Sequence, residues 1–201
     1  TCSILRITVI ICGLLFFSGS YAQQRLLVFT KTSGYRHNSI NNGLSAIQQM
    51  GNTGGFEVVQ TENANDFNLN YLSGFNAVVF LSTTGDVLNN SQQAEFEKYI
   101  QSGGGYVGVH AATDCEYNWP WYGRLVGAWF NGHPDIQNAT LYVTDNSHPS
   151  TSNLPSPWQR TDEWYNFGNF QSNVNVLLRI DENSYSGGTM GNYHPIAWYH
   201  N

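Results

Sequence analysis

The chain has 201 residues, a net charge of −6 at pH 7 and only eight lysines and arginines. It contains no basic run, so nucleic acid is not an expected partner, because binding to phosphates requires clustered Lys and Arg. Aromatic residues make up 14% of the chain and charged residues only 11%, a composition that suits a protein handling neutral polar ligands such as carbohydrates. Composition alone does not separate a carbohydrate enzyme from a carbohydrate-binding protein.

The first 22 residues have the pattern of a secretory signal peptide. Arg6 precedes a long apolar run, and the small residues Ser20 and Ala22 stand three and one positions before the expected cleavage site. The apolar run is shorter than the roughly 20 residues that a membrane-spanning helix needs, so stable membrane insertion is not expected. We therefore expect a secreted or periplasmic protein whose mature part, residues 23–201, forms one domain.

Strands and helices are predicted to alternate along the first half of the mature chain. Short apolar runs predict strands at Arg25–Thr30, Phe56–Thr61, Asn76–Ser82 and Tyr106–Val109. Between them, one helix is expected from Ser39 to Gly51, with Ile40, Leu44, Ile47 and Met50 facing inward, and another after Ser91, with Phe96, Tyr99 and Ile100 facing inward. This alternation indicates an α/β fold in which helices cover both faces of a mostly parallel sheet and the last two of these strands are central.

The regular alternation of strands and helices is not continued in the second half of the chain. Residues 117–130 are rich in aromatic side chains and predict a short helix packed over the site. Three further strands with a more amphipathic, edge-like pattern are predicted, at Ala139–Thr144, Val174–Asp181 and Pro195–Tyr199. The sequence shows no repeat and no linker, which favours a single domain.

His110 is the most informative residue of the sequence. It directly follows the apolar strand that ends at Val109, and it is followed by Ala111 and Ala112. In α/β enzymes, a strand that ends in a sharp turn among small residues presents one side chain at the carboxyl edge of the sheet, where ligands bind. A nucleophilic enzyme places Cys or Ser there. A histidine argues against glutamine amidotransferase chemistry and leaves metal binding, acid–base catalysis or sugar recognition.

Other candidate residues also follow predicted strand ends. His37 lies after the first strand, in a loop that is expected to share one crevice with His110. Asp162 and Glu163 are candidate carboxylate partners for His110, with His133 and His194 as further histidines. Cys115, the only cysteine of the mature chain, is expected to be an inert structural residue, because an active thiol would need an activating base and partial exposure.

Aromatic residues near these positions are candidate sugar-binding surfaces. Trp119 and Trp121 flank Pro120, and Trp164 and Tyr165 directly follow the acidic pair. Core packing is the alternative for such large rings, because each one buries about 150–250 Å². We expect these four rings, together with His37, to contact the ligand.

Two kinds of chemistry fit the histidines and carboxylates. Zn²⁺ or another divalent metal could be held by His110, His133 and His194, with one position left open to water. No H-E-x-x-H or C-x-x-C spacing supports this metal set. Without a metal, His110 with Asp162 or Glu163 could act as an acid–base pair on a sugar.

Four separated motifs resemble the ThuA-like (trehalose-utilisation) family. They are residues 28–37 (VFTKTSGYRH), 104–112 (GGYVGVHAA), 161–165 (TDEWY) and 194–198 (HPIAW). The resemblance implies a class I glutamine amidotransferase-like fold, a flavodoxin-like three-layer sandwich, with His110 where amidotransferases keep their cysteine. It also implies a role in sugar metabolism and a site at His37, His110, Asp162, Glu163 and His194, with His133 as a weaker match. Because the family continues with further elements, we expect the domain at 23–201 to be incomplete at its C-terminus, with further domains conceivable beyond Asn201.

The leading hypothesis is a secreted domain for the utilisation of a carbohydrate, either a trehalose-like di- or oligosaccharide or a keto-sugar. The reaction would be a hydrolase, lyase or isomerase step that uses a metal or a His–carboxylate pair. The alternative is a carbohydrate-binding or scaffold domain without catalysis, built on an amidotransferase-like fold.

Overall fold

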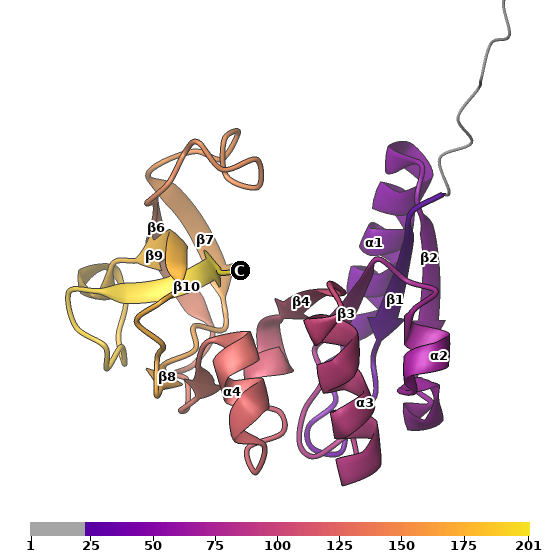
Figure 1. Ribbon diagram of the computed structural model, residues 1–201. Helices are drawn as coiled ribbons and strands as arrows, with labels where there is room; N and C mark the ends of the chain where they lie inside the picture. Colours follow the sequence, from indigo (N-terminus) through magenta and orange to yellow (C-terminus); the bar gives the residue numbers. More distant parts are fainter. Residues whose placement is uncertain (1–22) are drawn as a thin grey trace, which may run out of the picture.

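The computed structural model describes residues 23–201 (Figure 1). The predicted signal peptide, residues 1–22, lies outside the described residues. The first half of the described chain forms a parallel sheet, and most of the second half forms an antiparallel sheet. Within residues 23–201, no helix is both long and apolar enough to cross a bilayer.

The parallel sheet has the strand order β2-β1-β3-β4. Its strands are β1 (Arg25–Phe29), β2 (Glu57–Thr61), β3 (Ala77–Leu81) and β4 (Gly105–Val109). The strand order reverses between β1 and β3, the kind of position at which open α/β sheets bind ligands, beyond the carboxyl ends of the strands. The four strands predicted in this half of the chain are therefore confirmed.

Helices cover both faces of this sheet, which makes a three-layer α/β sandwich of the flavodoxin-like kind. Side chains alternate between the two faces of a strand. On one face, Val28, Val79 and Leu81 pack against Leu44 and Ile47 of α1 (Ile40–Gly54). On the other face, Leu27, Phe29, Val78 and Phe80 pack with residues of three helices, α2 (Leu69–Leu72), α3 (Asn90–Gln101) and α4 (Pro120–Val126). The second cluster is the larger core of the molecule.

Two helix boundaries differ from the predicted ones. α1 continues through Gly51 and ends at Gly54, with Gly55 in the left-handed conformation as its C-cap. Gly51 is buried inside this helix because its backbone lies against Phe56 and Val58, and Met50 is 59% exposed rather than inward. α3 is capped by Asn89 instead of Ser91.

The cap of α3 is a reciprocal capping box. The Asn89 side chain accepts a hydrogen bond from the backbone N–H of Gln92, and the Gln92 side chain accepts one from the backbone N–H of Asn89. This arrangement satisfies two backbone groups that the first turn of a helix leaves unpaired.

The later strands form their own sheet, which is antiparallel and has the order β10-β9-β6-β7. Its strands are β6 (Gln137–Val143), β7 (Trp158–Asp162), β9 (Asn175–Ile180) and β10 (His194–Tyr199), and a small two-stranded sheet pairs β5 (Trp129–Phe130) with β8 (Phe167–Gly168). Figure 1 shows this part of the chain, in orange and yellow, on the far side of α4 from β1 and β2. In the described chain, β4 therefore lies at an edge of the parallel sheet, not at its centre as predicted.

The antiparallel sheet has a small core of its own. Ala139, Leu141 and Ile180 are buried together with Trp164, and Trp158 packs against them. This one-sided burial explains the amphipathic pattern of the later strands, because an antiparallel sheet can leave its other face in water. Short 3-10 helices at Ala64–Asp66, His110–Thr113 and Glu182–Ser184 complete the described elements.

Candidate functional site

His110 occupies a strained turn at the carboxyl end of β4. Its φ angle is +51°, in the left-handed region that non-glycine residues seldom adopt. Such a conformation costs of the order of 1–3 kcal/mol and persists only where the surrounding structure imposes it. The 3-10 helix His110–Thr113 begins at this residue, and its two alanines, Ala111 and Ala112, are fully buried. The small alanines let the chain turn sharply, and the imidazole is left at the edge of the sheet.

His37 reaches the same place from the loop after β1. The loop after β3 holds this segment, because the carbonyl oxygen of Thr84 accepts hydrogen bonds from the backbone N–H groups of Ser33 and Gly34. The Thr84 hydroxyl also donates to the carbonyl of Tyr35 at 2.8 Å. These bonds fix the backbone two residues before His37.

Glu163 comes from the antiparallel part of the molecule. It directly follows β7, and its backbone N–H donates to Oδ1 of Asp162 at 3.0 Å. The other oxygen of Asp162 pairs with Arg160 at 2.9 Å. Asp162 therefore anchors the turn that carries Glu163, while Glu163 itself points at the histidines.

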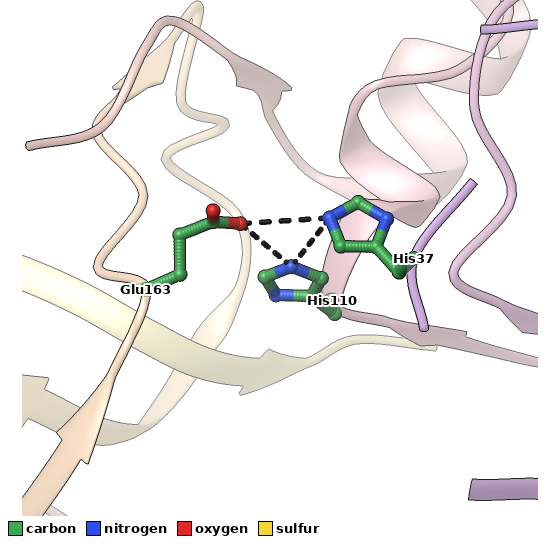
Figure 2. A group of neighbouring side chains, drawn as sticks. All are labelled: His37, His110 and Glu163. Atoms are coloured by element: carbon green, nitrogen blue, oxygen red, sulfur yellow. Dashed lines mark hydrogen bonds and ion pairs between the residues drawn. The ribbon is translucent and has the colours of Figure 1, made fainter. Parts of the chain in front are cut away.

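The three side chains converge on one point, as Figure 2 shows. Nε2 of His110 lies 3.1 Å from Nε2 of His37 and 3.0 Å from Oε2 of Glu163, and the distance from His37 Nε2 to the same oxygen is 3.5 Å. Ligand atoms that share one tetrahedral zinc ion stand about 3.3 Å apart, given metal–ligand bonds of about 2.0–2.1 Å. The separations in this cluster match that spacing.

The lone pairs and N–H donors of the three side chains are also compatible with a bound cation. Each of the three facing atoms can offer a lone pair, and a single N–H of His110 can satisfy only part of the triangle. The Nδ1 atom of His37 is buried and has no hydrogen-bond partner among the described residues. When Nε2 of His37 offers its lone pair to the cluster, this Nδ1 carries the single proton of the neutral ring.

The environment favours the neutral form of His110. Burial is the largest influence and lowers the pKa of His110, and the neighbouring His37 lowers it further. The carboxylates of Glu163 and Asp162 act in the opposite direction and only partly offset the shift. A neutral imidazole keeps the lone pair that a metal ligand or a general base needs.

His133 approaches the outer oxygen of Glu163. Its Nε2 lies 3.4 Å from Oε1 of Glu163, and its Nδ1 lies 2.8 Å from the carbonyl oxygen of Pro134. Because a carbonyl only accepts hydrogen bonds, Nδ1 carries the proton in the neutral ring and Nε2 presents a lone pair. His133 is thus beside the cluster but outside the triangle of facing atoms.

Tyr165 forms one wall of the site. Its ring lies 4.5 Å from the ring of His110 and 4.3 Å from that of Phe130, measured between centroids, and it stacks on His133 at 5.7 Å. Burial and the nearby Glu163 carboxylate raise the pKa of the Tyr165 hydroxyl, so the phenol stays protonated.

The structure places His194 away from the cluster. It is completely buried, its Nε2 donates to the carbonyl oxygen of Tyr165 at 2.8 Å, and its Nδ1 lies 2.8 Å from Oε1 of Glu182. With both ring nitrogens engaged, His194 supports the backbone of Tyr165. The expected metal set of His110, His133 and His194 is corrected accordingly. Among the described residues, the set that meets is His37, His110 and Glu163.

The expected tryptophan surface is also corrected. Trp119 is only 7% exposed, donates from its indole N–H to Glu97 and stacks on Trp121, which packs against Phe96 of α3. α4 accordingly packs on the core beside α3. Trp164 is buried in the antiparallel core. Trp119 and Trp164 lack the exposed face that a sugar would need, and Trp121 is partly buried against the same core.

Cys115 is fully buried. Its thiol donates to the carbonyl oxygen of Gly85, and burial raises its pKa, so the reactive thiolate is disfavoured. Its position past the turn and its lack of exposure fit a structural residue.

Two tyrosines near the site were not predicted from the sequence. Tyr35 precedes His37 by two positions, and Tyr117 donates from its hydroxyl to Asp114 at 2.7 Å. Their positions in the sequence could have indicated a role in the site, because they lie in the segments after β1 and β4 that carry the two histidines.

Comparison with known proteins agrees with this architecture. No curated protein matches the sequence. Among solved structures, a ThuA-like protein from Bacteroides uniformis superposes with a TM-score of 0.74 at 23% identity, covering 90% of this chain and 80% of that one. A ThuA-like protein from Parabacteroides merdae gives a TM-score of 0.69 at 21% identity, covering 88% and 75%. At these identities the likeness shows the fold.

The family assignment comes from the sequence match. Residues 25–201 match the family described as ThuA, trehalose utilisation, which is nearly the whole of the part that the structure describes. The chain therefore belongs to the ThuA family, and with it to the proteins of carbohydrate utilisation in general.

Proposed function

We propose that this domain binds one divalent transition-metal ion, zinc foremost, through His37, His110 and Glu163. We propose further that it uses this site to process a trehalose-like di- or oligosaccharide or a keto-sugar outside the cytoplasm. The observation that carries the proposal is the triangle of Nε2, Nε2 and Oε2 atoms with sides of 3.0–3.5 Å. Two neutral imidazoles and one carboxylate are a ligand set that suits zinc and leaves a position open.

A bound divalent ion would supply Lewis acidity, either by lowering the pKa of a water molecule or by polarising a sugar carbonyl. The residues around it have separate tasks. The strained turn at His110 presents the imidazole at the sheet edge, and Asp162 anchors the turn that carries Glu163. Tyr165 covers one face of His110 and restricts access of water from that side.

His133 is the group best placed to move a proton. Its tautomer is set by the bond to the carbonyl of Pro134, so Nε2 is the basic atom, and the side chain is about one-third exposed. A base of this kind can accept a proton from a sugar hydroxyl or from a carbon next to a carbonyl, and return it later. The hydrogen bond to the Pro134 carbonyl and the stacked ring of Tyr165 hold the imidazole in place.

The decisive experiment is elemental analysis of the purified protein beside three variants. We expect nearly one equivalent of zinc or another transition metal in the wild type, and loss of that metal in His110→Ala and Glu163→Gln. His148→Ala is the matched control, because His148 is half-buried in a separate loop, where it bonds to Ser150 and packs on Tyr199. Absence of metal from the wild type, even after incubation with Zn²⁺, would refute the metal site.

One observation supports a second candidate, metal-free acid–base catalysis. Nε2 of His110 lies within hydrogen-bond distance of both His37 and Glu163, so one proton could be shared among the three groups. This candidate predicts a metal-free wild type whose turnover of the sugar depends on His110. Sugar binding without turnover would instead support a carbohydrate-binding domain that lacks catalysis.

A further inference from the structure

The large aromatic rings left exposed beside the cluster are tyrosines. Tyr35 is 68% exposed and Tyr117 is 42% exposed, whereas the nearby Trp119 is buried in the core. A large ring that stays in water on an ordered loop presents an apolar face that a ligand can cover.

The backbone holds Tyr35 in place while its side chain remains free. The carbonyl oxygen of Tyr35 accepts the Thr84 hydroxyl, and the preceding residues bond to the Thr84 carbonyl. The ring meets the ring of His37 edge-on, with centroids 4.8 Å apart and an interplanar angle of 86°. Tyr35 therefore stands directly beside one member of the cluster with most of its surface open.

Tyr117 lies at the opposite end of a series of side-chain contacts that begins at Tyr35. His37 touches His110 at 4.6 Å, and the ring of Tyr165 covers His110 and packs on Phe130. The hydroxyl of Tyr117 donates to Asp114 and lies 3.2 Å from the carbonyl oxygen of Phe130. Trp129 backs the Tyr117 ring at 6.2 Å in a nearly parallel arrangement. The His37–His110 pair thus lies between the two exposed tyrosines along this chain of neighbours.

The charges around the site indicate a neutral ligand. The carboxylates of Asp114 and Glu163 both act on Tyr165, and the Asp162 carboxylate acts on His110. Asp162 is paired with Arg160, and Glu163 belongs to the triangle proposed to hold the cation, so the charge that bears on a ligand is chiefly that of Asp114, which accepts the Tyr117 hydroxyl. A carboxylate at this position disfavours a phosphorylated or carboxylated sugar and suits hydroxyl groups, which can donate hydrogen bonds to it.

We propose that Tyr35 and Tyr117 are two stacking positions for neutral pyranose rings, so that the ligand has at least two sugar units and the linkage between them lies over His37, His110 and Glu163. This inference rests on the proposed function, which it deepens by naming the size and charge of the sugar. Aromatic faces pack well against the C–H surface of a sugar ring, and the phenol hydroxyl of Tyr35 remains available to water or to the ligand.

The test is calorimetric titration of the wild type with trehalose, which has two rings, and with glucose, which has one. We expect trehalose to bind at least tenfold more tightly than glucose. Tyr35→Ala and Tyr117→Ala should each weaken trehalose binding by about tenfold, in keeping with the loss of one ring contact. Tyr35→Phe should restore binding because it retains the ring. Tyr142→Ala is the matched control, since Tyr142 is a similarly exposed tyrosine on β6.

Metal content measured on the same samples separates this inference from the proposed function. If both alanine variants bind trehalose like the wild type while retaining metal, the stacking positions are refuted and the metal site stands. A wild type that binds trehalose no better than glucose, or binds neither, overturns the two-ring ligand. Weakened trehalose binding in the tyrosine variants of a metal-free protein would support the stacking positions and refute the metal site.

Discussion

The Nε2 atoms of His37 and His110 face each other at 3.1 Å, although the two residues are 73 positions apart in the chain. Each is delivered by a loop at the carboxyl edge of the parallel sheet, and Glu163 meets them from the antiparallel sheet. The cluster therefore joins the two parts of the molecule. Any change that loosens one part relative to the other is expected to disturb the cluster.

Replacement of Glu163 by glutamine should weaken metal binding more than any neighbouring change. The variant keeps the shape of the side chain but removes the negative charge that faces both histidines. Loss of a supporting residue around a metal ligand costs about 10–100-fold in affinity, so loss of a ligand charge should cost at least 100-fold. Competition with a chelator of known zinc affinity measures the change. Asp162 supports the turn but does not belong to the triangle, so Asp162→Asn should lower metal affinity less than Glu163→Gln does. Equal losses of affinity in the two variants would contradict the assigned roles.

Glu116 should prove important for stability although it lies outside the cluster. It is almost fully buried, its Oε1 accepts the backbone N–H groups of Val87 and Leu88, and its Oε2 accepts the side-chain amide of Gln93. Glu116→Ala would leave two buried N–H groups unpaired and should lower the free energy of unfolding by about 2–4 kcal/mol. Glu116→Gln, which keeps an acceptor oxygen, should cost clearly less. Urea unfolding of both variants checks this, and equal costs would show that the hydrogen bonds are not the cause.

The same carboxyl group should make stability depend on pH. Burial raises the pKa of Glu116 above its ordinary value of 4.5. Between 4.5 and that raised value, the folded state holds a proton that the unfolded state has lost. The Glu116 contribution to stability is therefore fully present below pH 4.5 and disappears as pH rises through the folded-state pKa. Melting temperatures from pH 4.5 to 8 should fall more steeply for the wild type than for Glu116→Gln, and parallel curves would contradict the prediction.

Gly127 should tolerate no side chain. Its φ is +92°, and an added Cβ would collide with the indole of Trp198, whose N–H donates to the carbonyl of Val126. Gly127→Ala combines backbone strain with this collision and should destabilise the protein by about 2–4 kcal/mol. Gly103→Ala is the control, because Gly103 has a similar φ of +100° and open space around it, so it isolates the strain. Thermal unfolding of both variants should show the larger loss for Gly127→Ala.

Cys115 should be inert toward thiol reagents in the native protein. The thiol is fully buried and burial raises its pKa, so both access and thiolate formation are restricted. Incubation of residues 23–201 with iodoacetamide at pH 8 should give no adduct by mass spectrometry, and one adduct after denaturation. Rapid modification of the folded protein, with loss of sugar binding, would instead revive a role for Cys115 in the site.

Local pattern was sufficient for the first half of the fold. Apolar runs located β1, β2, β3 and β4 to within a residue or two. In β1 and β3 the apolar run reflects burial on both faces, whereas β2 and β4 are edge strands that are only partly buried. Helix ends were less accurate. Gly51 looked like a stop signal, but its real role is close packing against β2, a tertiary contact that spacing along one helix does not reveal.

The second half shows what local pattern does not contain. Ala139–Val143 and Asn175–Ile180 were recognisable as strands, yet nothing in their periodicity states which strand each will pair with. Pairing depends on contacts between distant segments, such as the antiparallel register of Leu141 with Ile180. β7 was missed altogether, since Trp158–Asp162 is mostly polar and its three central residues are exposed.

Strand-and-helix periodicity and the short motifs around His37, His110 and Glu163 were enough to predict the α/β class, the family and the residue types of the site. They do not say which of the candidate groups meet, because that depends on how the chain packs. His194 and the tryptophans carry the same chemistry as residues in the site, but His194 is buried against Glu182 and Trp119 against the core. Whether a side chain faces a ligand or a core depends on packing between segments far apart in the chain, and that information is spread over all of them.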